Sequence, residues 1–376
     1  MNPLRSLLGR WRAPACSTAQ SHVARGKELS AEGHHAQAAA AFRDAIALDA
    51  DCAEAHYGLG LALRDQQQLG AALNSYRRAT ELAPDHIEAH NNMGALLQLQ
   101  GDLNGALTSY RRAVSLKPPF TQPYLNLGRL CESIGQLQDA SDCYRAAISA
   151  GVDTDTFGHL LNAATGVTTG RAPAAYARTV FDNFAADFDR RLVDDLGYRI
   201  PQILAERVKA LIPDVKLRVL DLGCGTGLCG VQLQGRCERL TGVDVSPAML
   251  ARASAHGIYD DVCEMDVTDY LRTAPSSHYN VVLAADVFVY IGDLARVFMD
   301  VSRVLKAGGV FGFSVEQAAG ERDFVLQPVG RFAQSVAYIR RLCSANGLVE
   351  SESIAQTIRG DPATTAPGCV FLLSKL

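Results

Sequence analysis

The chain has 376 residues, of which 48% are hydrophobic and 20% are charged, and its formal net charge is −4. This length suggests two or three domains, and the hydrophobic content is ample for sizeable cores. A negative net charge argues against tight electrostatic binding to nucleic acid or to an anionic membrane. No stretch approaches the roughly 18 uninterrupted apolar residues that a membrane-spanning helix needs.

Ten cysteines are scattered singly along the chain, and no Cys-x-x-Cys pair occurs. Most of them lie within apolar runs, and no cluster of His and Asp residues suggests a metal. We therefore expect buried, reduced thiols in a cytoplasmic protein, with neither disulfides nor a zinc site.

Residues 1–18 carry Arg5, Arg10 and Arg12 and no acidic residue. Their apolar run, Leu7-Leu8, is too short for a secretory signal. An organelle transit peptide stays open, but we expect a frayed or weakly helical N-terminal extension.

Residues 19–154 repeat with a period of 34, in blocks that begin at Ala19, Ala53, Ile87 and Thr121. Glycine stands at the eighth position of each block, alanine at the twentieth and twenty-seventh, and an aromatic residue at the twenty-fourth. The glycines are Gly26, Gly60, Gly94 and Gly128, and the aromatics are Phe42, Tyr76, Tyr110 and Tyr144. This pattern resembles the tetratricopeptide repeat, a helix-turn-helix unit. We expect the small residues to let paired helices approach closely, and the aromatics to fill the gap towards the next unit.

Such an array presents a concave groove lined by the first helix of each unit. Asn92 and Asn126 stand at the sixth position of their blocks, where some tetratricopeptide proteins use asparagine to hold the backbone of an extended peptide. Asparagine suits this task because it both donates and accepts hydrogen bonds. It is also a common consensus residue there, so a purely structural role stays open. We expect the groove to bind a protein or peptide partner.

Residues 155–173 form the junction. Phe157, Leu160, Leu161 and Ala164 fall on one face of a helix, which could cap the last repeat as solenoids require. Residues 166–173 then read as a loop or linker.

The stretch LRVLDLGCGTG, residues 217–227, predicts a buried strand that ends in a glycine-rich turn. Gly223, Gly225 and Gly227 lack Cβ atoms, so the turn can adopt positive φ and a ligand can lie against bare backbone. Asp221 lies near the carboxyl end of this strand, and Asp244 ends the next one. A carboxylate about 20 residues past the turn is placed to accept hydrogen bonds from ribose hydroxyls. The stretch therefore predicts a nucleoside site.

Two families share parts of this pattern. Residues 225–230 match the dinucleotide fingerprint G-x-G-x-x-G, but the match begins late relative to the strand and is short enough to arise by chance. The longer string from Asp221 to Gly227 resembles the first motif of class I S-adenosylmethionine-dependent methyltransferases. Asp221 would repel a pyrophosphate, but suits a ligand that carries a sulfonium and an ammonium group.

The resemblance implies an α-helical tetratricopeptide solenoid followed by a Rossmann-like α/β domain over residues 174–376, with a seven-stranded, mostly parallel sheet. It implies that S-adenosyl-L-methionine is the cofactor and that residues of the first three strand ends bind it: Asp221, Gly223, Cys224, Gly225, Gly227, Asp244, Val245, Asp266 and Val267. Asp266 would accept from the adenine amino group, begin the following helix, or do both. Residues 174–213 would form lid helices, in which FDNFAADFD places Phe181, Phe184 and Phe188 on one face.

Asp286 and Tyr290 follow the fourth strand and are the residues we expect nearest the methyl acceptor. Asp286 could accept a substrate proton or merely cap the next segment, and Tyr290 could be a pocket wall. Asn-Pro-Pro-Tyr is absent after this strand, so the resemblance does not support adenine, cytosine or glutamine-amide methylation. Three hypotheses remain: a methyltransferase with partner-binding repeats, a scaffold that binds cofactor without catalysis, and an NAD-dependent oxidoreductase.

Overall fold

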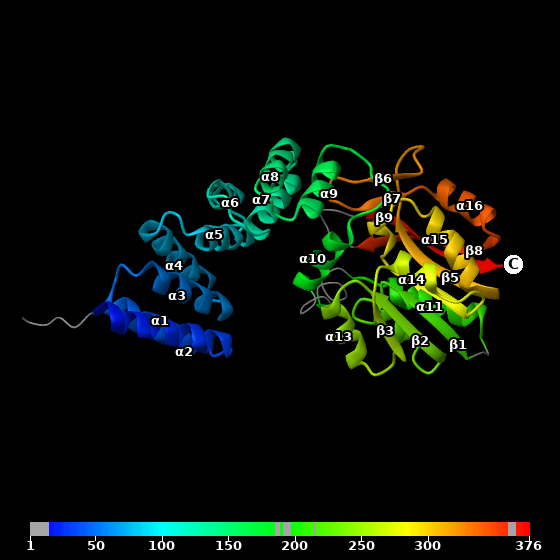
Figure 1. Ribbon diagram of the computed structural model, residues 1–376, viewed down its shortest axis with the longest axis horizontal. Helices are drawn as coiled ribbons and strands as arrows, with labels where there is room; N and C mark the ends of the chain where they lie inside the picture. Colours follow the sequence, from blue (N-terminus) through cyan, green and yellow to red (C-terminus); the bar gives the residue numbers. More distant parts are fainter. Residues whose placement is uncertain (1–14, 185–188, 191–196, 214–215, 360–365) are drawn as a thin grey trace, which may run out of the picture. The chain divides into compact units, whose positions relative to one another are not determined.

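The computed structural model describes residues 15–184, 189–190, 197–213, 216–359 and 366–376. The chain divides into two compact units, Met1–Asp153 and Thr154–Leu376 (Figure 1). The proposed N-terminal extension lies almost wholly outside the described residues, and the first helix begins at Ala15.

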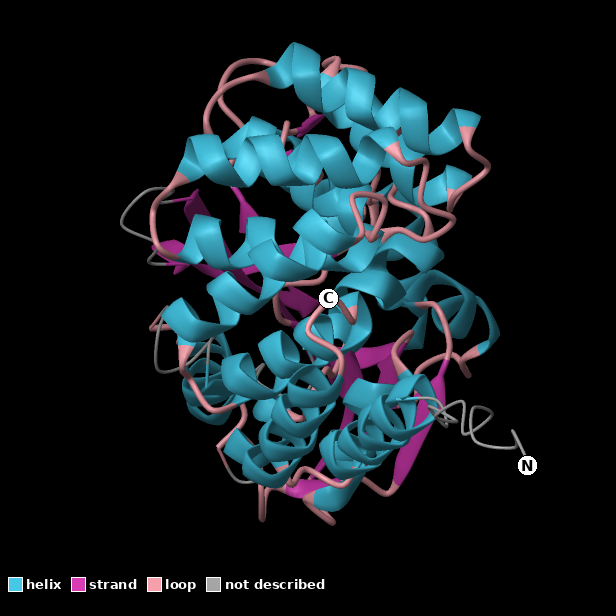
Figure 2. Ribbon diagram, turned by 90° about the vertical axis from the view of Figure 1, so that its left-hand side faces the viewer, coloured by secondary structure: helices cyan, strands magenta, loops and turns pink. Residues whose placement is uncertain are grey.

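Eight helices make up the described part of the first unit. They are α1 (Ala15–Ala31), α2 (His35–Leu48), α3 (Ala53–Asp65), α4 (Leu69–Leu82), α5 (Ile87–Leu99), α6 (Leu103–Ser115), α7 (Gln122–Ser133) and α8 (Leu137–Ser149). Successive helices pack as pairs, and each pair falls within one 34-residue block, except that α1 begins four residues before the first block (Figure 1). Figure 2 shows the helices and strands of the chain by colour. The helical repeat array expected from the sequence is confirmed.

Each repeat's aromatic residue packs on the glycine of its own helix pair. A Cβ atom at Gly60 would lie 2.5 Å from Tyr76 Cε1, and one at Gly94 would lie 2.7 Å from Tyr110 Cδ1. The rings of Tyr76 and Tyr110 therefore pack within their own units, which the sequence analysis did not foresee, and their packing towards the next unit stays a prediction. Phe42 does reach forward, because its ring also covers Gly58 of the following unit.

The second unit is built on a seven-stranded sheet with the order β3-β2-β1-β4-β5-β9-β8. Its strands are β1 (Leu217–Leu222), β2 (Cys237–Asp244), β3 (Asp261–Glu264), β4 (Tyr279–Ala284), β5 (Leu305–Glu316), β8 (Leu348–Arg359) and β9 (Ala366–Lys375). The first five strands pair in parallel, and β9 runs antiparallel between β5 and β8. This confirms the expected Rossmann-like, mostly parallel sheet.

Alternate residues of the central strands enter two separate cores. Val219, Val281 and Val310 pack on one face against α11 (Ile200–Leu211) and α12 (Leu228–Gln232). Leu220, Val282 and Phe311 pack on the other face, which is covered by α14 (Val267–Thr273), α15 (Ala295–Val304) and α16 (Val336–Ala345). Helix α13 (Pro247–Ala255) packs against β2 and β3. A sheet covered on both faces explains why its strands read as continuous apolar runs.

Helix α9 (Thr154–Ala164) belongs to the second unit. His159 Nε2 lies 2.9 Å from the carbonyl oxygen of Gly330, and the His159 ring centroid lies 4.7 Å from that of Tyr176. Gly330 lies in the turn between β6 (Phe324–Leu326) and β7 (Phe332–Gln334), a two-stranded sheet that the sequence analysis did not foresee. Because of these contacts, α9, which was expected to cap the repeats, is part of the unit that contains the sheet.

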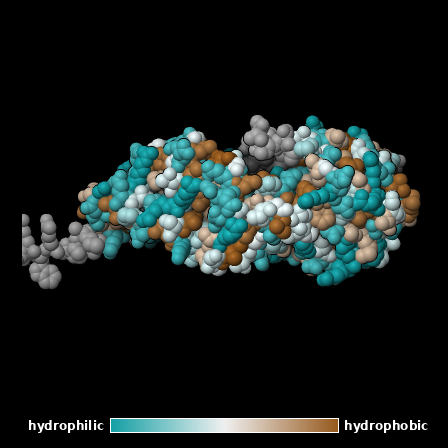
Figure 3. Space-filling model, turned by 90° about the horizontal axis from the view of Figure 1, so that it is seen from above, coloured by the Kyte–Doolittle hydropathy of each residue, from teal (hydrophilic) through white to brown (hydrophobic). Residues whose placement is uncertain are grey.

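Apolar residues on the face seen in Figure 3 lie singly or in small groups among hydrophilic ones. In the part of the chain that the structure describes, no helix combines the length and apolar character needed to cross a membrane.

We expect Gly94→Ala to lower the free energy of unfolding of the repeats by about 1–3 kcal/mol, because the new methyl group overpacks against Tyr110. Gly70→Ala in α4 is the matched control, since a Cβ there meets nothing within 4 Å. It should be neutral, or stabilising by up to about 1 kcal/mol through helix propensity. Urea unfolding followed by far-UV circular dichroism measures both. Equal stability of the two variants would contradict this packing.

A chain of residues 154–376 should fold and remain soluble, because it contains the whole second unit. A chain that starts at Ala174 should be less stable, since it lacks α9 and uncovers the Gly330 turn. The loss of Leu160, which is 1% exposed, should alone cost about 1.5–3 kcal/mol. Thermal unfolding compares the two chains. Identical melting temperatures would show that α9 contributes nothing to this unit.

Candidate functional site

The glycine turn after β1 has the backbone conformation that the sequence predicts. The φ angles are +61° at Gly223, +54° at Gly225 and +95° at Gly227, all in the left-handed region that favours glycine. A Cβ at Gly223 would lie 2.6 Å from Val287 Cγ2, so this glycine lets the turn touch the loop after β4. A Cβ at Gly225 would meet nothing within 4 Å, so open space lies over that backbone.

Asp221 lies beneath this turn and does not line the pocket. It is 1% exposed, and Tyr259 Oη donates a hydrogen bond to its Oδ2 at 2.7 Å. Burial raises the pKa of Asp221 to about 7, although the bond from Tyr259 acts in the opposite direction. This carboxyl group is thus buried away from the pocket, and burial disfavours its charged form, so the structure gives no added support to the argument that Asp221 repels a pyrophosphate.

Tyr259 accounts for the glycine at the last position of the G-x-G-x-x-G match, residues 225–230. A Cβ at Gly230 would lie 2.6 Å from Tyr259 Oη, and one at Gly242 would lie 2.9 Å from Tyr259 Cδ1. A Cβ at Gly227 would also lie close to this ring, 3.0 Å from Tyr259 Cε2. The last glycine of the apparent dinucleotide fingerprint therefore makes room for a tyrosine, and its presence needs no dinucleotide.

Asp244 ends β2 and holds the glycine turn in place. Its Oδ2 accepts a hydrogen bond from the Gly225 amide and its Oδ1 accepts one from the Ser246 amide, each at 2.9 Å. Burial raises the pKa of Asp244, while these amide bonds lower it. An ionised carboxylate has about four acceptor positions, so these amides leave acceptor capacity for a ligand hydroxyl. Asp244 lines the pocket.

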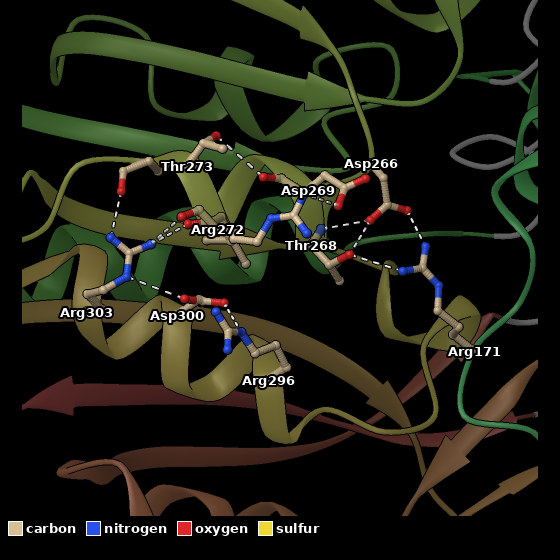
Figure 4. Close-up of polar contacts among 11 residues, drawn as sticks. Arg171, Asp266, Thr268, Asp269, Arg272, Thr273, Arg296, Asp300 and Arg303 are labelled. Carbon is tan, nitrogen blue, oxygen red and sulfur yellow. Dashed lines mark hydrogen bonds and ion pairs between the residues drawn. The ribbon is translucent and has the colours of Figure 1, made fainter.

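Asp266 is the N-cap of α14 and is also held by Arg171, from the segment of residues 166–173 (Figure 4). Its Oδ1 accepts from the Thr268 amide at 2.9 Å, which is an N-cap. Its Oδ2 lies 2.6 Å from Arg171 Nη2, and Arg171 Nη1 donates to Thr268 Oγ1 at 3.1 Å. The capping role considered for Asp266 is present, and the ion pair with Arg171 was not foreseen.

The segment around Arg171 forms a wall of the site. The Gly170 carbonyl accepts from the amides of Gly292 and Asp293, and the Ala172 amide donates to the Tyr290 carbonyl at 2.9 Å. The residues expected to be a linker are therefore fastened to the loop after β4. This arrangement sets Arg171 beside Asp266.

Asp286 adopts φ +61°, a left-handed conformation that few residues other than glycine and Asn or Asp accept. Its amide donates to Ser314 Oγ of β5 at 2.9 Å, which helps to hold this turn. The ring centroid of Tyr290, one turn further on, lies 5.4 Å from that of Phe181 in an edge-to-face contact. Backbone strain such as the left-handed conformation of Asp286 is concentrated at functional sites.

One pocket brings most of the predicted residues together. Of the expected set it is lined by Gly223, Cys224, Gly225, Asp244, Val245, Asp266, Val267, Asp286 and Tyr290. Asp221 and Gly227 are the two that do not line it. The space between its atoms, open solvent at the mouth included, is about 920 Å³. Among the residues that the structure describes, no group of three or more His, Cys, Asp or Glu residues could hold a metal ion.

The lid segment contacts the pocket through residues that the sequence analysis passed over. Phe181 of α10 (Ala174–Phe184) lines the pocket, whereas the side chain of Phe184 and the whole of Phe188 lie outside the described residues. Asp182 Oδ1 accepts from Ser246 Oγ, and Asp189 Oδ1 accepts from Thr226 Oγ1, each at 2.5 Å. Both aspartates belong to FDNFAADFD, but the sequence does not show which hydroxyls they meet.

In the repeats, Asn92 and Asn126 both take part in hydrogen bonds between units. Asn92 Nδ2 donates to Tyr57 Oη at 3.2 Å, and Asn126 Nδ2 donates to Asn91 Oδ1 at 2.9 Å. Asn91 also donates to Asn92 Oδ1 at 3.4 Å. This network provides the structural role that the sequence analysis left open, and a partner's backbone would have to share or replace it.

Comparison with known families matches residues 219–309 to a methyltransferase domain. Residues 19–52, 87–120 and 121–150 match the tetratricopeptide repeat, and residues 60–101 match a TPR repeat.

Among curated proteins, the chain is 29% identical over 136 residues to the biotin biosynthesis bifunctional protein BioHC of Saccharophagus degradans, covering 36% of this chain and 23% of that protein. It is 32% identical over 104 residues to the ubiquinone biosynthesis O-methyltransferase of Hahella chejuensis, covering 26% of this chain and 42% of that protein. The chain thus spans less than half the length of these relatives.

A solved structure with a similar chain is the N-methyltransferase NodS of Bradyrhizobium japonicum in complex with S-adenosyl-L-homocysteine. Its TM-score is 0.42 and its sequence identity is 18%, with coverage of 53% of this chain and 97% of that one. The family matches thus place a stretch that matches a methyltransferase domain after tetratricopeptide repeats in this chain.

Proposed function

We propose that the protein transfers the methyl group of S-adenosyl-L-methionine to an acceptor bound in the same pocket. The observation that carries this proposal is that one pocket, at one edge of the sheet, is lined by the glycine turn and by Asp244, Asp266 and Asp286. The open space over Gly225 fits a ligand that lies against the backbone. The cofactor supplies an activated methyl group and a neutral sulfide leaving group, so the protein mainly supplies position and a dry pocket.

Three parts of the pocket would hold the three parts of the cofactor. The acceptor capacity that Asp244 retains beside its bonds from the Gly225 and Ser246 amides suits the ribose hydroxyls, because hydroxyl groups donate hydrogen bonds. Asp266, with the Val267 amide beside it, suits the adenine edge, and Arg171 fixes the carboxylate for that task. Gly223, Cys224 and Gly225 leave room for the methionine end.

Asp286 and Tyr290 would face the acceptor. Both line the pocket. They lie beside the glycine turn, because Val287, which stands between them in the sequence, packs against Gly223. Ala172, Ala177, Phe181 and the Tyr290 ring surround this side with apolar surface, which would exclude water from the reacting atoms.

The repeats would recruit a protein or peptide partner or position the acceptor. Tetratricopeptide arrays present extended surfaces of this kind, and the polar side chains of Asn92 and Asn126 lie on the first helices of their units. We place the protein in the cytoplasm, since nine of its ten cysteines are free thiols.

The scaffold and oxidoreductase alternatives are less well supported. A scaffold without catalysis would have no need of the strained Asp286 turn. An oxidoreductase had only the glycine fingerprint in its favour, and Tyr259 accounts for the last glycine of that fingerprint.

The full chain should bind S-adenosyl-L-methionine and S-adenosyl-L-homocysteine, and NAD should bind far more weakly. Asp244→Ala should weaken cofactor binding by roughly ten- to a hundredfold or more, because charge-assisted hydrogen bonds contribute about 1.5–3 kcal/mol each. Asp269→Ala, an exposed change on α14, is the control and should bind normally. Isothermal titration calorimetry measures all of these. Tight NAD binding, or unchanged affinity of a folded Asp244→Ala variant, would refute the proposal.

Asp182→Ala should weaken cofactor binding several-fold and speed hydrogen exchange in α10, because Ser246 Oγ loses the acceptor that fastens this helix to the ribose-binding turn. Asp182→Asn keeps an acceptor oxygen and should restore most of the affinity. Calorimetry with S-adenosyl-L-homocysteine and exchange mass spectrometry provide the two readouts. If the alanine and wild-type proteins behave alike, Asp182 does not couple the helix to the site.

A further inference from the structure

The loop that follows β4 carries both residues that would face the acceptor. Asp286 and Tyr290 line the pocket, and between them Val287 packs against Gly223 of the glycine turn. The loop contains the 3₁₀ helix η3 (Phe288–Tyr290), a single short turn. A turn of this length makes few hydrogen bonds of its own, so its position depends on groups outside it. The place of this pocket wall therefore depends on what holds η3.

Gln334, the last residue of β7, holds this loop without lining the pocket. Its side chain is buried, and its Nε2 donates one hydrogen bond to the Phe288 carbonyl at 2.9 Å and one to the Ile291 carbonyl at 2.8 Å. Because both partners are carbonyl oxygens, the atom that faces them must be the amide nitrogen. Its Oε1 has no hydrogen-bond partner among the residues that the structure describes. The side chain therefore acts on the loop through its two N–H groups.

Few side chains could replace Gln334 in this task. Among neutral side chains, only asparagine and glutamine carry two N–H groups on one nitrogen, and asparagine is shorter by one methylene group. A lysine or arginine would bring an unpaired charge into a buried site, which is costly. The backbone of Gln334 is itself fixed, because its carbonyl accepts from the Ala318 amide at 3.0 Å and β7 pairs with β6. The donor pair is thus held in place before any ligand binds.

We propose that Gln334 is a positioning residue of the site: its two hydrogen bonds fix the loop after β4, and through this loop they set the shape of the pocket. This inference rests on the proposed methyl transfer. Gln334 itself touches neither the cofactor nor the acceptor. Its effect on them passes through the main chain of η3.

Two paths connect η3 to the cofactor side of the pocket. The first runs through Val287, which packs against Gly223 of the glycine turn. The second runs through the Tyr290 carbonyl, which lies in sequence between the two carbonyls that the glutamine holds and accepts from the Ala172 amide at 2.9 Å. Ala172 directly follows Arg171, which pairs with the carboxylate suited to the adenine edge. A shift of η3 would therefore be felt by the cofactor as well as by the acceptor.

Gln334→Met keeps the length of the side chain but removes both N–H groups. It should weaken binding of S-adenosyl-L-homocysteine by about three- to tenfold, because two neutral hydrogen bonds are lost and the loop can shift. The amides of Ala172, Gly292 and Asp293 should exchange faster, since their bonds join the loop to the segment before α10. Gln317→Met, at an exposed glutamine bridged to Gln334, is the matched control and should behave like wild type. Calorimetry and exchange mass spectrometry of the full chain give the two readouts.

Gln334→Glu separates the donor role from simple packing. Burial beside two carbonyl oxygens should raise the pKa of the new carboxyl group. Below that pKa the neutral carboxyl donates one hydrogen bond, and above it the carboxylate repels both carbonyls. The affinity of this variant for S-adenosyl-L-homocysteine, divided by that of wild type, should therefore fall from about pH 6 to about pH 8. The same ratio for Gln334→Met should not change, and the division removes titrations that both proteins share, such as that of Asp221.

Three results would overturn the inference while leaving the proposed methyl transfer intact. A folded Gln334→Met variant could bind S-adenosyl-L-homocysteine and exchange its amides as wild type does. Gln334→Met and Gln334→Glu could show the same dependence on pH. If Gln334→Met does not fold, an affinity ratio for Gln334→Glu that does not change with pH would decide against the donor role. A wild-type protein that does not bind S-adenosyl-L-homocysteine would instead refute the proposed methyl transfer, and the inference with it.

Discussion

The hydrogen bond between Tyr259 and Asp221 lies directly beneath the glycine turn, and β1, β2 and α12 all meet around it. The tyrosine ring occupies the space that side chains at Gly227, Gly230 and Gly242 would need. Its hydroxyl satisfies a carboxyl group that is almost completely buried. Glycines in three different segments are thus required by one side chain, which also sets the height of the turn above the sheet.

The carboxyl ends of the parallel strands then bring the charged residues together. Asp244, Asp266 and Asp286 each follow a strand, and each is fixed by backbone or hydroxyl groups before any ligand is bound. The opposite wall depends on backbone bonds from Gly170 and Ala172 to the loop after β4. The site is therefore formed largely in advance, which lowers the cost of ordering groups when a ligand binds.

Strong periodicity made the repeats, the parallel strands and the glycine turn predictable from the sequence, and it placed most of the pocket residues. The contacts between distant segments were not predictable. Nothing in the sequence near Tyr259 links it to Asp221, and Arg171 lies in a stretch that reads as a linker. The strands β6 and β7 have three residues each, too few to show alternation. The burial of Asp221 was not predictable, because a strand end does not reveal which side of the turn its side chain takes.

The position of β9 has a consequence for synthesis. Residues 366–375 pair with β5 on one side and β8 on the other, so a late segment of the chain occupies the interior of the sheet. While the chain is being made, β5 and β8 leave the ribosome before the strand that joins them. Until then each presents an open edge on which another chain can pair. A message cut short before residue 366 would leave both edges permanently exposed, and its product would be prone to aggregate rather than merely inactive.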